Sequence, residues 1–309
     1  MEDMLLAFEG GGSKTRILLA DLEERVRASE LGKSSSSLYI ERASYLAETT
    51  RLLRRVKRTA DRAHGRIRVA GLAGPLDLKL VTLAIRSVFG RVRISCISEG
   101  DIALALHDLE AGVSLVAGTG SSCRALNEKG EHTSCGGFGP QFGDEGSGYW
   151  IGREAIAAVV RARDGRGPKT KLTKRLMAYL RISDLWRIHE NPNGSGHLFP
   201  PRVAGFTPQV FDAARDGDAV ARGICRSAGR ELAGLVVAAT RQARIRRRPI
   251  PLVLTGGVFR GEDLILRPFK QVLRESGLKF QIYPPVTEPA MGIVKLLARQ
   301  RQRKSAHVS

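Results

Sequence analysis

Gly10-Gly-Gly-Ser-Lys-Thr-Arg-Ile-Leu18 is repeated, with changes, 108 residues later as Gly118-Thr-Gly-Ser-Ser-Cys-Arg-Ala-Leu126. Five of the nine positions are identical, namely the first, third, fourth, seventh and ninth. Each copy follows a short apolar segment and precedes another, so each is expected to be a glycine turn between two strands. Because the offset has the size of a domain, we interpret the repeat as an internal duplication.

Glycine turns at strand ends expose backbone N–H groups that can hold phosphates. A third such turn is expected at Gly256-Gly257, which follows the apolar segment 251–254. Neither the P-loop spacing nor the third glycine of a dinucleotide-binding fingerprint is present. The alternative interpretation is that these are tight β-turns without a ligand. Two matched turns and a third one favour binding of a phosphate chain.

The segments outside these turns alternate between strand and helix patterns. We expect strands at 4–8, 16–20, 26–31, 67–72, 92–97, 113–117, 123–126, 251–254 and 279–283. We expect helices at about 38–64, 76–89, 99–109, 149–163 and 172–180, helices over 206–242 that break around 216–218, a helix between 257 and 279, and a last helix from 288 onward, with a glycine-rich loop at 134–148. This alternation predicts an α/β fold with helical crossovers.

Composition excludes some classes of protein. Fifty basic residues stand against 31 acidic ones, but the arginine runs contain no interleaved aromatic residues and no nucleic-acid-binding motif. Solvated helix faces are therefore the leading interpretation, with attraction of an anionic substrate or a polyanion as the alternative. The four cysteines form no Cys-x-x-Cys pair, and no apolar run is long enough for a membrane span. We expect a cytoplasmic protein with reduced thiols and no membrane or nucleic-acid partner.

Three blocks carry a resemblance to a known family: residues 9–15, residues 117–124, and Cys135-Gly-Gly-Phe-Gly-Pro-Gln-Phe-Gly-Asp-Glu-Gly-Ser-Gly-Tyr-Trp-Ile-Gly152. They resemble the N-acetylglucosamine kinase and BadF-type ATPase family of the actin-like sugar kinase and Hsp70 superfamily. The resemblance covers nearly the whole chain. It implies a duplicated actin-like, ribonuclease H-like fold, in which each lobe has a mixed five-stranded sheet flanked by helices and ATP lies between the lobes.

The same resemblance implies the division of the chain. Residues 1–111, together with a C-terminal helix at about 287–300, would form the N-terminal lobe. Residues 112–286 would form the C-terminal lobe, and residues 301–309 a disordered tail.

The resemblance also implies the roles of individual residues. Those expected to bind ATP are Gly10, Gly11, Gly12, Ser13, Lys14, Gly118, Thr119, Gly120, Ala228, Gly256 and Gly257. Those expected to surround the sugar are Ser36, Ser121, Ser122, Gly137, Phe138, Gly139 and Asp144. The family branch has an asparagine in place of Ser36 and a tryptophan in place of Phe138. A carboxylate at Asp144 can accept two hydrogen bonds from sugar hydroxyls, although Asp144 could instead cap the helix expected from Tyr149.

Two acidic positions depart from the family pattern. Glu9 stands where the family commonly has aspartate, and it could hold Mg²⁺ through water. Glu99 takes the position of the catalytic base, with Asp101 as the rival. A helix N-terminus lowers the pKa of a carboxyl group, so Glu99 is expected to have a lowered pKa and to accept a hydroxyl proton. The alternative is that Glu99 only caps its helix.

These assignments predict an ATP- and Mg²⁺-dependent kinase that phosphorylates an amino sugar, N-acetylglucosamine or glucosamine, at the C6 hydroxyl. Many members of the family form homodimers. One alternative is a BadF-type ATPase that couples hydrolysis to a partner protein, although suitably spaced cysteines for a cluster are missing. The other alternative is a non-catalytic sugar sensor.

Overall fold

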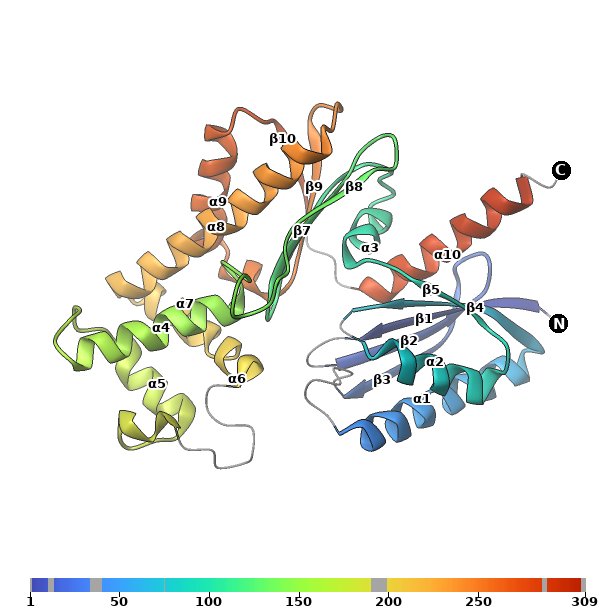
Figure 1. Ribbon diagram of the computed structural model, residues 1–309, viewed down its shortest axis with the longest axis horizontal. Helices are drawn as coiled ribbons and strands as arrows, with labels where there is room; N and C mark the ends of the chain where they lie inside the picture. Colours follow the sequence, from blue (N-terminus) through green and yellow to red (C-terminus); the bar gives the residue numbers. More distant parts are fainter. Residues whose placement is uncertain are drawn as a thin grey trace. The chain divides into compact units, whose positions relative to one another are not determined.

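The computed structural model describes residues 2–10, 14–33, 41–74, 76–189, 199–284 and 288–306. The chain divides into two compact units, one made of residues 1–109 and 286–309 and the other of residues 110–285. Each unit is built on one five-stranded mixed sheet (Figure 1). No helix of the described part of the chain is both long enough and apolar enough to cross a membrane.

The first unit has the sheet order β3-β2-β1-β4-β5. Its strands are β1 (Glu2–Gly10), β2 (Lys14–Ala20), β3 (Val26–Lys33), β4 (Gly65–Ala73) and β5 (Arg93–Cys96). Its helices are α1 (Arg42–Arg62), α2 (Leu78–Phe89), α3 (Glu99–Leu106) and α10 (Pro289–Ala306). Strand β1 pairs antiparallel with β2 and parallel with β4, and β4 is parallel to β5. The carboxyl ends of β1, β4 and β5 therefore share one edge.

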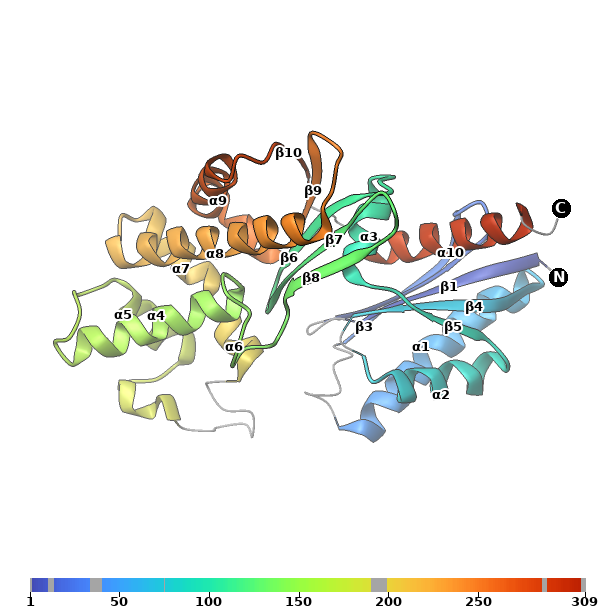
Figure 2. The ribbon, with the colours of Figure 1, turned by 45° about the horizontal axis from the view of Figure 1, so that its top comes forward.

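Strand β1 is buried on both faces, and its alternation assigns its side chains to two cores. Met4, Leu6 and Phe8 pack with α1 and α2, whereas Leu5 and Ala7 pack with α3 and α10. Figure 2 shows α1 and α2 on one side of this sheet and α3 and α10 on the other.

The second unit has the order β10-β9-β6-β7-β8, with the same pattern of parallel and antiparallel pairs as the first. Its strands are β6 (Gly112–Ala117), β7 (Ser121–Leu126), β8 (His132–Gly136), β9 (Ile250–Thr255) and β10 (Phe280–Tyr283). Its helices are α4 (Gly148–Arg163), α5 (Leu172–Leu180), α6 (Pro200–Ala204), α7 (Thr207–Arg215), α8 (Ala219–Ala243) and α9 (Asp263–Glu275), with short 3-10 turns at Leu185–His189 and Gly257–Gly261. The α/β class and the duplicated five-stranded sheets are confirmed.

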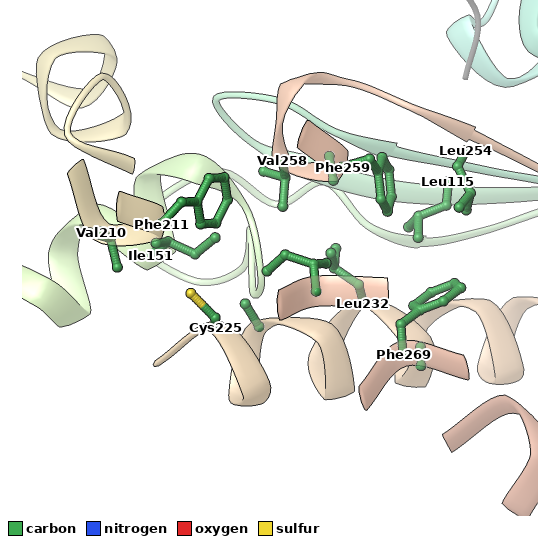
Figure 3. Close-up of a cluster of buried hydrophobic side chains, with 14 of the residues drawn as sticks. Leu115, Ile151, Val210, Phe211, Cys225, Leu232, Leu254, Val258, Phe259 and Phe269 are labelled. Atoms are coloured by element: carbon green, nitrogen blue, oxygen red, sulfur yellow. The ribbon is translucent and has the colours of Figure 1, made fainter. Parts of the chain in front are cut away.

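The core of the second unit lies between its sheet and helices α8 and α9. Figure 3 shows Leu115 and Leu254 from adjacent strands, with Leu232 of α8 and Phe269 of α9 in the same cluster. The helices cross closely at Gly229, where an added Cβ would lie 2.4 Å from the carbonyl oxygen of Ile265. The glycine thus permits α8 and α9 to pack against the same sheet.

Two expectations about element boundaries are wrong. Residues 134–136 are not part of the loop but belong to β8, because their backbone pairs with β7 and extends that hairpin. The tail is not disordered from residue 301, since α10 continues to Ala306. Arg301 forms a 2.7 Å ion pair with Asp3, which holds this last part of the helix against the first unit.

Candidate functional site

The candidate site of the first unit is the carboxyl edge of its sheet. Glu9 is near the end of β1 and pairs in register with Ala73, the last residue of β4. Glu99 is the first residue of α3, three residues after β5 ends. Ligands of open α/β sheets bind at this edge. The local topology therefore brings together two carboxylates that are 90 residues apart in the sequence.

A close backbone contact shapes this edge. Gly74 follows β4 with φ of +94°, and a Cβ there would lie 1.8 Å from the carbonyl oxygen of Gly10. Only glycine combines this dihedral angle with this approach. Gly74 was not among the predicted site residues, although a glycine directly after a buried strand was the available signal. Three of the expected phosphate-binding residues, Gly11, Gly12 and Ser13, lie outside the described residues.

The charges around Glu9 act against each other. Burial raises the pKa of Glu9, and the negative charges of Glu99 and Glu288 raise it further. The positive charges of Lys14 and Arg16 lower it. Arg16 is the cross-strand neighbour of Glu9 and donates to both oxygens of Glu288, at 2.9 and 3.0 Å. The side chain of Lys14 is exposed at the start of β2. Acidic and basic side chains therefore lie together at the carboxyl edge of the first sheet.

The expectation that Glu99 has a lowered pKa is wrong. Its pKa is raised because surrounding protein desolvates the carboxylate, although the residue itself is exposed at the surface. The cap of α3 is Ser98, whose hydroxyl accepts the N–H of Asp101 at 3.1 Å, so Glu99 is not the capping residue. A raised pKa makes the ionised group a better proton acceptor.

A separate group of acids lies at the opposite end of β1. Glu2, Asp21 and Glu23 are close enough together to hold a metal ion. However, Asp21 is fully buried and accepts hydrogen bonds from Arg25 and Arg27, at 2.9 and 3.0 Å. These arginines already neutralise the carboxylate, and the group is not part of the candidate site.

In the second unit, the turn 118–120 connects β6 to β7 and is bonded to the start of α4. The N–H of Gly148 donates a hydrogen bond to the carbonyl oxygen of Gly118, with an N···O distance of 2.8 Å. The N–H of Tyr149 donates to the carbonyl oxygen of Thr119, at 3.0 Å. The backbone of Gly256, whose φ is +109°, lies against this turn, because a Cβ on Gly256 would lie 2.3 Å from the carbonyl oxygen of Ala117. The second and third glycine turns are therefore adjacent.

Asp144 connects the glycine-rich loop to the same turn. It is 8% exposed, and its Oδ1 accepts the N–H of Ser121 at 3.1 Å. A Cβ on Gly120 would lie 2.8 Å from each of its oxygens. Burial raises the pKa of Asp144, and the bond from Ser121 lowers it. Asp144 does not cap α4, because that helix is capped by Ser147, whose hydroxyl accepts the N–H of Trp150.

The remaining predicted sugar residues lie around this loop. Gly137 and Gly139 have φ of +79° and +82°, and Phe138 between them is 78% exposed. A Cβ on Gly137 would contact the Cβ of Ser122 at 3.2 Å. The hydroxyl of Ser121 is buried and donates to the carbonyl oxygen of Glu145 at 2.8 Å, so it supports the loop. Ser36 lies outside the described residues.

Ala228 and Gly257 differ in their surroundings. Ala228 is fully buried in α8, and its carbonyl oxygen would lie 2.6 Å from a Cβ on Gly146. Its side chain offers no surface to a nucleotide, and its backbone lies against the glycine-rich loop at Gly146. Gly257 is exposed, and a Cβ there would meet nothing within 4 Å.

Two known proteins that are similar to this chain are both named as N-acetylglucosamine kinases. The chain is 28% identical to the N-acetylmuramic acid/N-acetylglucosamine kinase of Clostridium acetobutylicum over 305 residues, covering 96% of this chain and 98% of that one. It is also 28% identical to the N-acetyl-D-glucosamine kinase of Dictyostelium discoideum over 195 residues, covering 62% of this chain and 60% of that one.

Solved structures share the fold. A Chromobacterium violaceum protein described as a candidate N-acetylglucosamine kinase superimposes with a TM-score of 0.74 at 25% identity, covering 95% of this chain and 98% of that one. The model of the BadF/BadG/BcrA/BcrD ATPase family matches residues 9–294. This match includes all three glycine turns, the glycine-rich loop and strands of both sheets, and the chain therefore belongs to the BadF/BadG/BcrA/BcrD ATPase family.

Proposed function

We propose that this protein is an ATP-dependent kinase that transfers the γ-phosphate to the C6 hydroxyl of an amino sugar, N-acetylglucosamine or glucosamine. One observation supports this most directly. Asp144, a buried carboxylate suited to sugar hydroxyls, is hydrogen-bonded to the residue that follows the 118–120 turn. A group that holds the acceptor is thereby attached to a group that holds the phosphate donor. Phosphoryl transfer depends mainly on such positioning.

Each group has a defined task in this reaction. The N–H groups of the glycine turns bind the phosphates, and Asp144 Oδ2, which accepts no hydrogen bond from the described residues, accepts from the sugar. Glu99 takes the proton of the attacking hydroxyl. The bond between that oxygen and the γ-phosphorus forms, and the bond between the γ-phosphorus and the bridging oxygen of ADP breaks.

Mg²⁺ fits the donor set of the first unit. Glu9 is a partly buried carboxylate whose negative neighbours, Glu99 and Glu288, raise its pKa. A hard divalent cation prefers such oxygen ligands and often keeps its waters. Glu9 would hold the ion through a water molecule. When bound, Mg²⁺ neutralises the charge of the phosphate chain.

The names of the similar proteins support the substrate class. The two relatives above are amino-sugar kinases by name, and a third, the glucosamine kinase of Vibrio cholerae, is 33% identical over 118 residues, 38% of each chain.

The test is an assay of the purified chain with ATP and Mg²⁺ against N-acetylglucosamine, glucosamine, N-acetylmuramic acid and glucose. We expect release of ADP with at least one amino sugar, little release without sugar, and a product phosphorylated at C6 by ³¹P and ¹³C NMR. Rapid ATP hydrolysis that no sugar stimulates would contradict a kinase and favour an ATPase that acts on a partner. Binding of a sugar without turnover would favour a sensor.

A further inference from the structure

Thr255, the last residue of β9, has a hydroxyl group that the fold does not use. Its Oγ1 is buried and has no hydrogen-bond partner among the described residues. Other buried hydroxyls of this unit are bonded: Thr207 Oγ1 donates to the carbonyl oxygen of Gly148 at 2.8 Å, and Thr240 Oγ1 to that of Val236 at 2.7 Å. A buried polar group without a partner costs free energy, so such a group in a native structure needs an explanation.

The position of Thr255 indicates a ligand at the carboxyl edge of the sheet. It pairs in register with Val116 of β6, two residues before Gly118. It also directly precedes Gly256, whose backbone lies against Ala117 and Gly118. Thr255 thus lies beside the two adjacent glycine turns of the second unit.

The alternation of β9 determines which face carries the hydroxyl. Leu252 and Leu254 belong to the core cluster, and Figure 3 shows Leu254 beside Leu115 in that cluster. Val253 and Thr255 therefore point to the other face of the sheet. Val116, the register partner of Thr255, and Val253 are both apolar, so they offer the hydroxyl no side-chain partner. Valine, which has nearly the same shape, would fit this position without a buried polar atom.

We propose that Thr255 is a nucleotide-binding residue whose hydroxyl donates a hydrogen bond to an oxygen of the phosphate chain. This inference rests on the proposed ATP dependence and adds a side-chain donor to turns that otherwise offer backbone N–H groups. An anionic oxygen is the acceptor that best offsets the free-energy cost of burying a donor, because hydrogen bonds to charged groups are stronger than those between neutral groups. The free protein carries the cost of the unpaired hydroxyl, and the bound nucleotide removes it.

The experiment compares three variants of the full chain by calorimetric titration with ADP, ATP and adenosine, and by thermal unfolding without ligand. Thr255→Val removes the hydroxyl and keeps the shape, whereas Thr255→Ser keeps the hydroxyl. Thr240→Val is the matched control, because it removes a buried hydroxyl that is bonded inside α8. We expect Thr255→Val to weaken ADP and ATP binding about tenfold and to leave adenosine binding unchanged.

The variants should also differ in stability. The ligand-free Thr255→Val protein should unfold at the same temperature as the unmodified chain or higher, and Thr255→Ser should bind ADP as the unmodified chain does. Thr240→Val should unfold at a lower temperature but keep its affinity for ADP. A Thr255→Val protein with unchanged ADP affinity, with equally weakened adenosine binding, or with lowered ligand-free stability overturns the inference.

The outcome is separable from that of the proposed function. If the unmodified chain binds ATP but phosphorylates no sugar, the kinase proposal fails and the Thr255 comparison still decides the inference. If the unmodified chain binds neither ADP nor ATP, both proposals are overturned.

Discussion

Glu99 is the residue on which the proposed phosphoryl transfer depends most directly. It begins α3 at the carboxyl edge of the first sheet, and desolvation by the surrounding protein raises its pKa above the ordinary value of 4.5. We expect Glu99→Gln to lower kcat by about 100- to 10,000-fold, as loss of a general base does. The affinity for ATP, measured by calorimetry, should stay within about twofold, because an amide at this position still fits the same space.

The matched comparison for Glu99 is Asp101→Asn, two residues further along the same helix. This variant should keep most of kcat if Glu99 is the base, and the reverse pattern would assign the role to Asp101. The pH profile gives a second readout. Since the base must be ionised, kcat should fall as pH drops through a pKa above that of a free glutamate, and Glu99→Gln should lose this dependence.

At the scale of elements, the β9 turn depends on one of its two glycines. Gly256 has φ of +109°, and a Cβ there would collide with the carbonyl oxygen of Ala117, whereas a Cβ on Gly257 would meet nothing within 4 Å. Gly256→Ala should lower the free energy of unfolding by about 1–3 kcal/mol through backbone strain alone, and by more if β6 and β9 are pushed apart. Gly257→Ala should change it by less than about 1 kcal/mol.

Urea unfolding followed by circular dichroism would measure both variants. Equal losses of stability for Gly256→Ala and Gly257→Ala would contradict the close contact between the second and third glycine turns.

At the scale of the whole molecule, the two units differ in whether one continuous segment of the chain forms them. Residues 110–285 form the second unit without interruption, whereas the first unit needs residues 286–309. Helix α10 contributes Ala290, Ile293, Val294, Leu297 and Ala298 to the core on one face of the first sheet. Burial of the three larger side chains alone contributes about 5 kcal/mol, which is comparable with the total stability of a domain.

We therefore expect the fragment 110–285 to unfold cooperatively and the fragment 1–109 to lack a cooperative transition. Fusion of 286–309 to 1–109 through a flexible linker should restore that transition in thermal unfolding. Cooperative unfolding of 1–109 alone would show that its second core does not require α10.

The α/β class, the duplication and most element boundaries could be predicted from the sequence because they depend on local patterns. Apolar periodicity marked the strands, and the matched glycine turns marked two equivalent hairpins, which the sheet orders of the two units bear out. The site residues remain predictions, but their grouping at strand ends followed from the same local reasoning. Strand β8 was missed because a short polar segment becomes a strand only through its pairing with β7.

The sequence alone determined where the chain turns and which residue types stand at those turns. The tertiary structure determined the pKa values, the hydrogen bonds and the ion pairs of such residues. Desolvation by the surrounding protein raises the pKa of Glu99, Asp144 accepts a hydrogen bond from Ser121 23 residues away, and Arg301 forms an ion pair with Asp3. Each of these depends on atoms that are distant in the sequence or on the solvent that they exclude. A propensity read from neighbouring residues cannot contain that information.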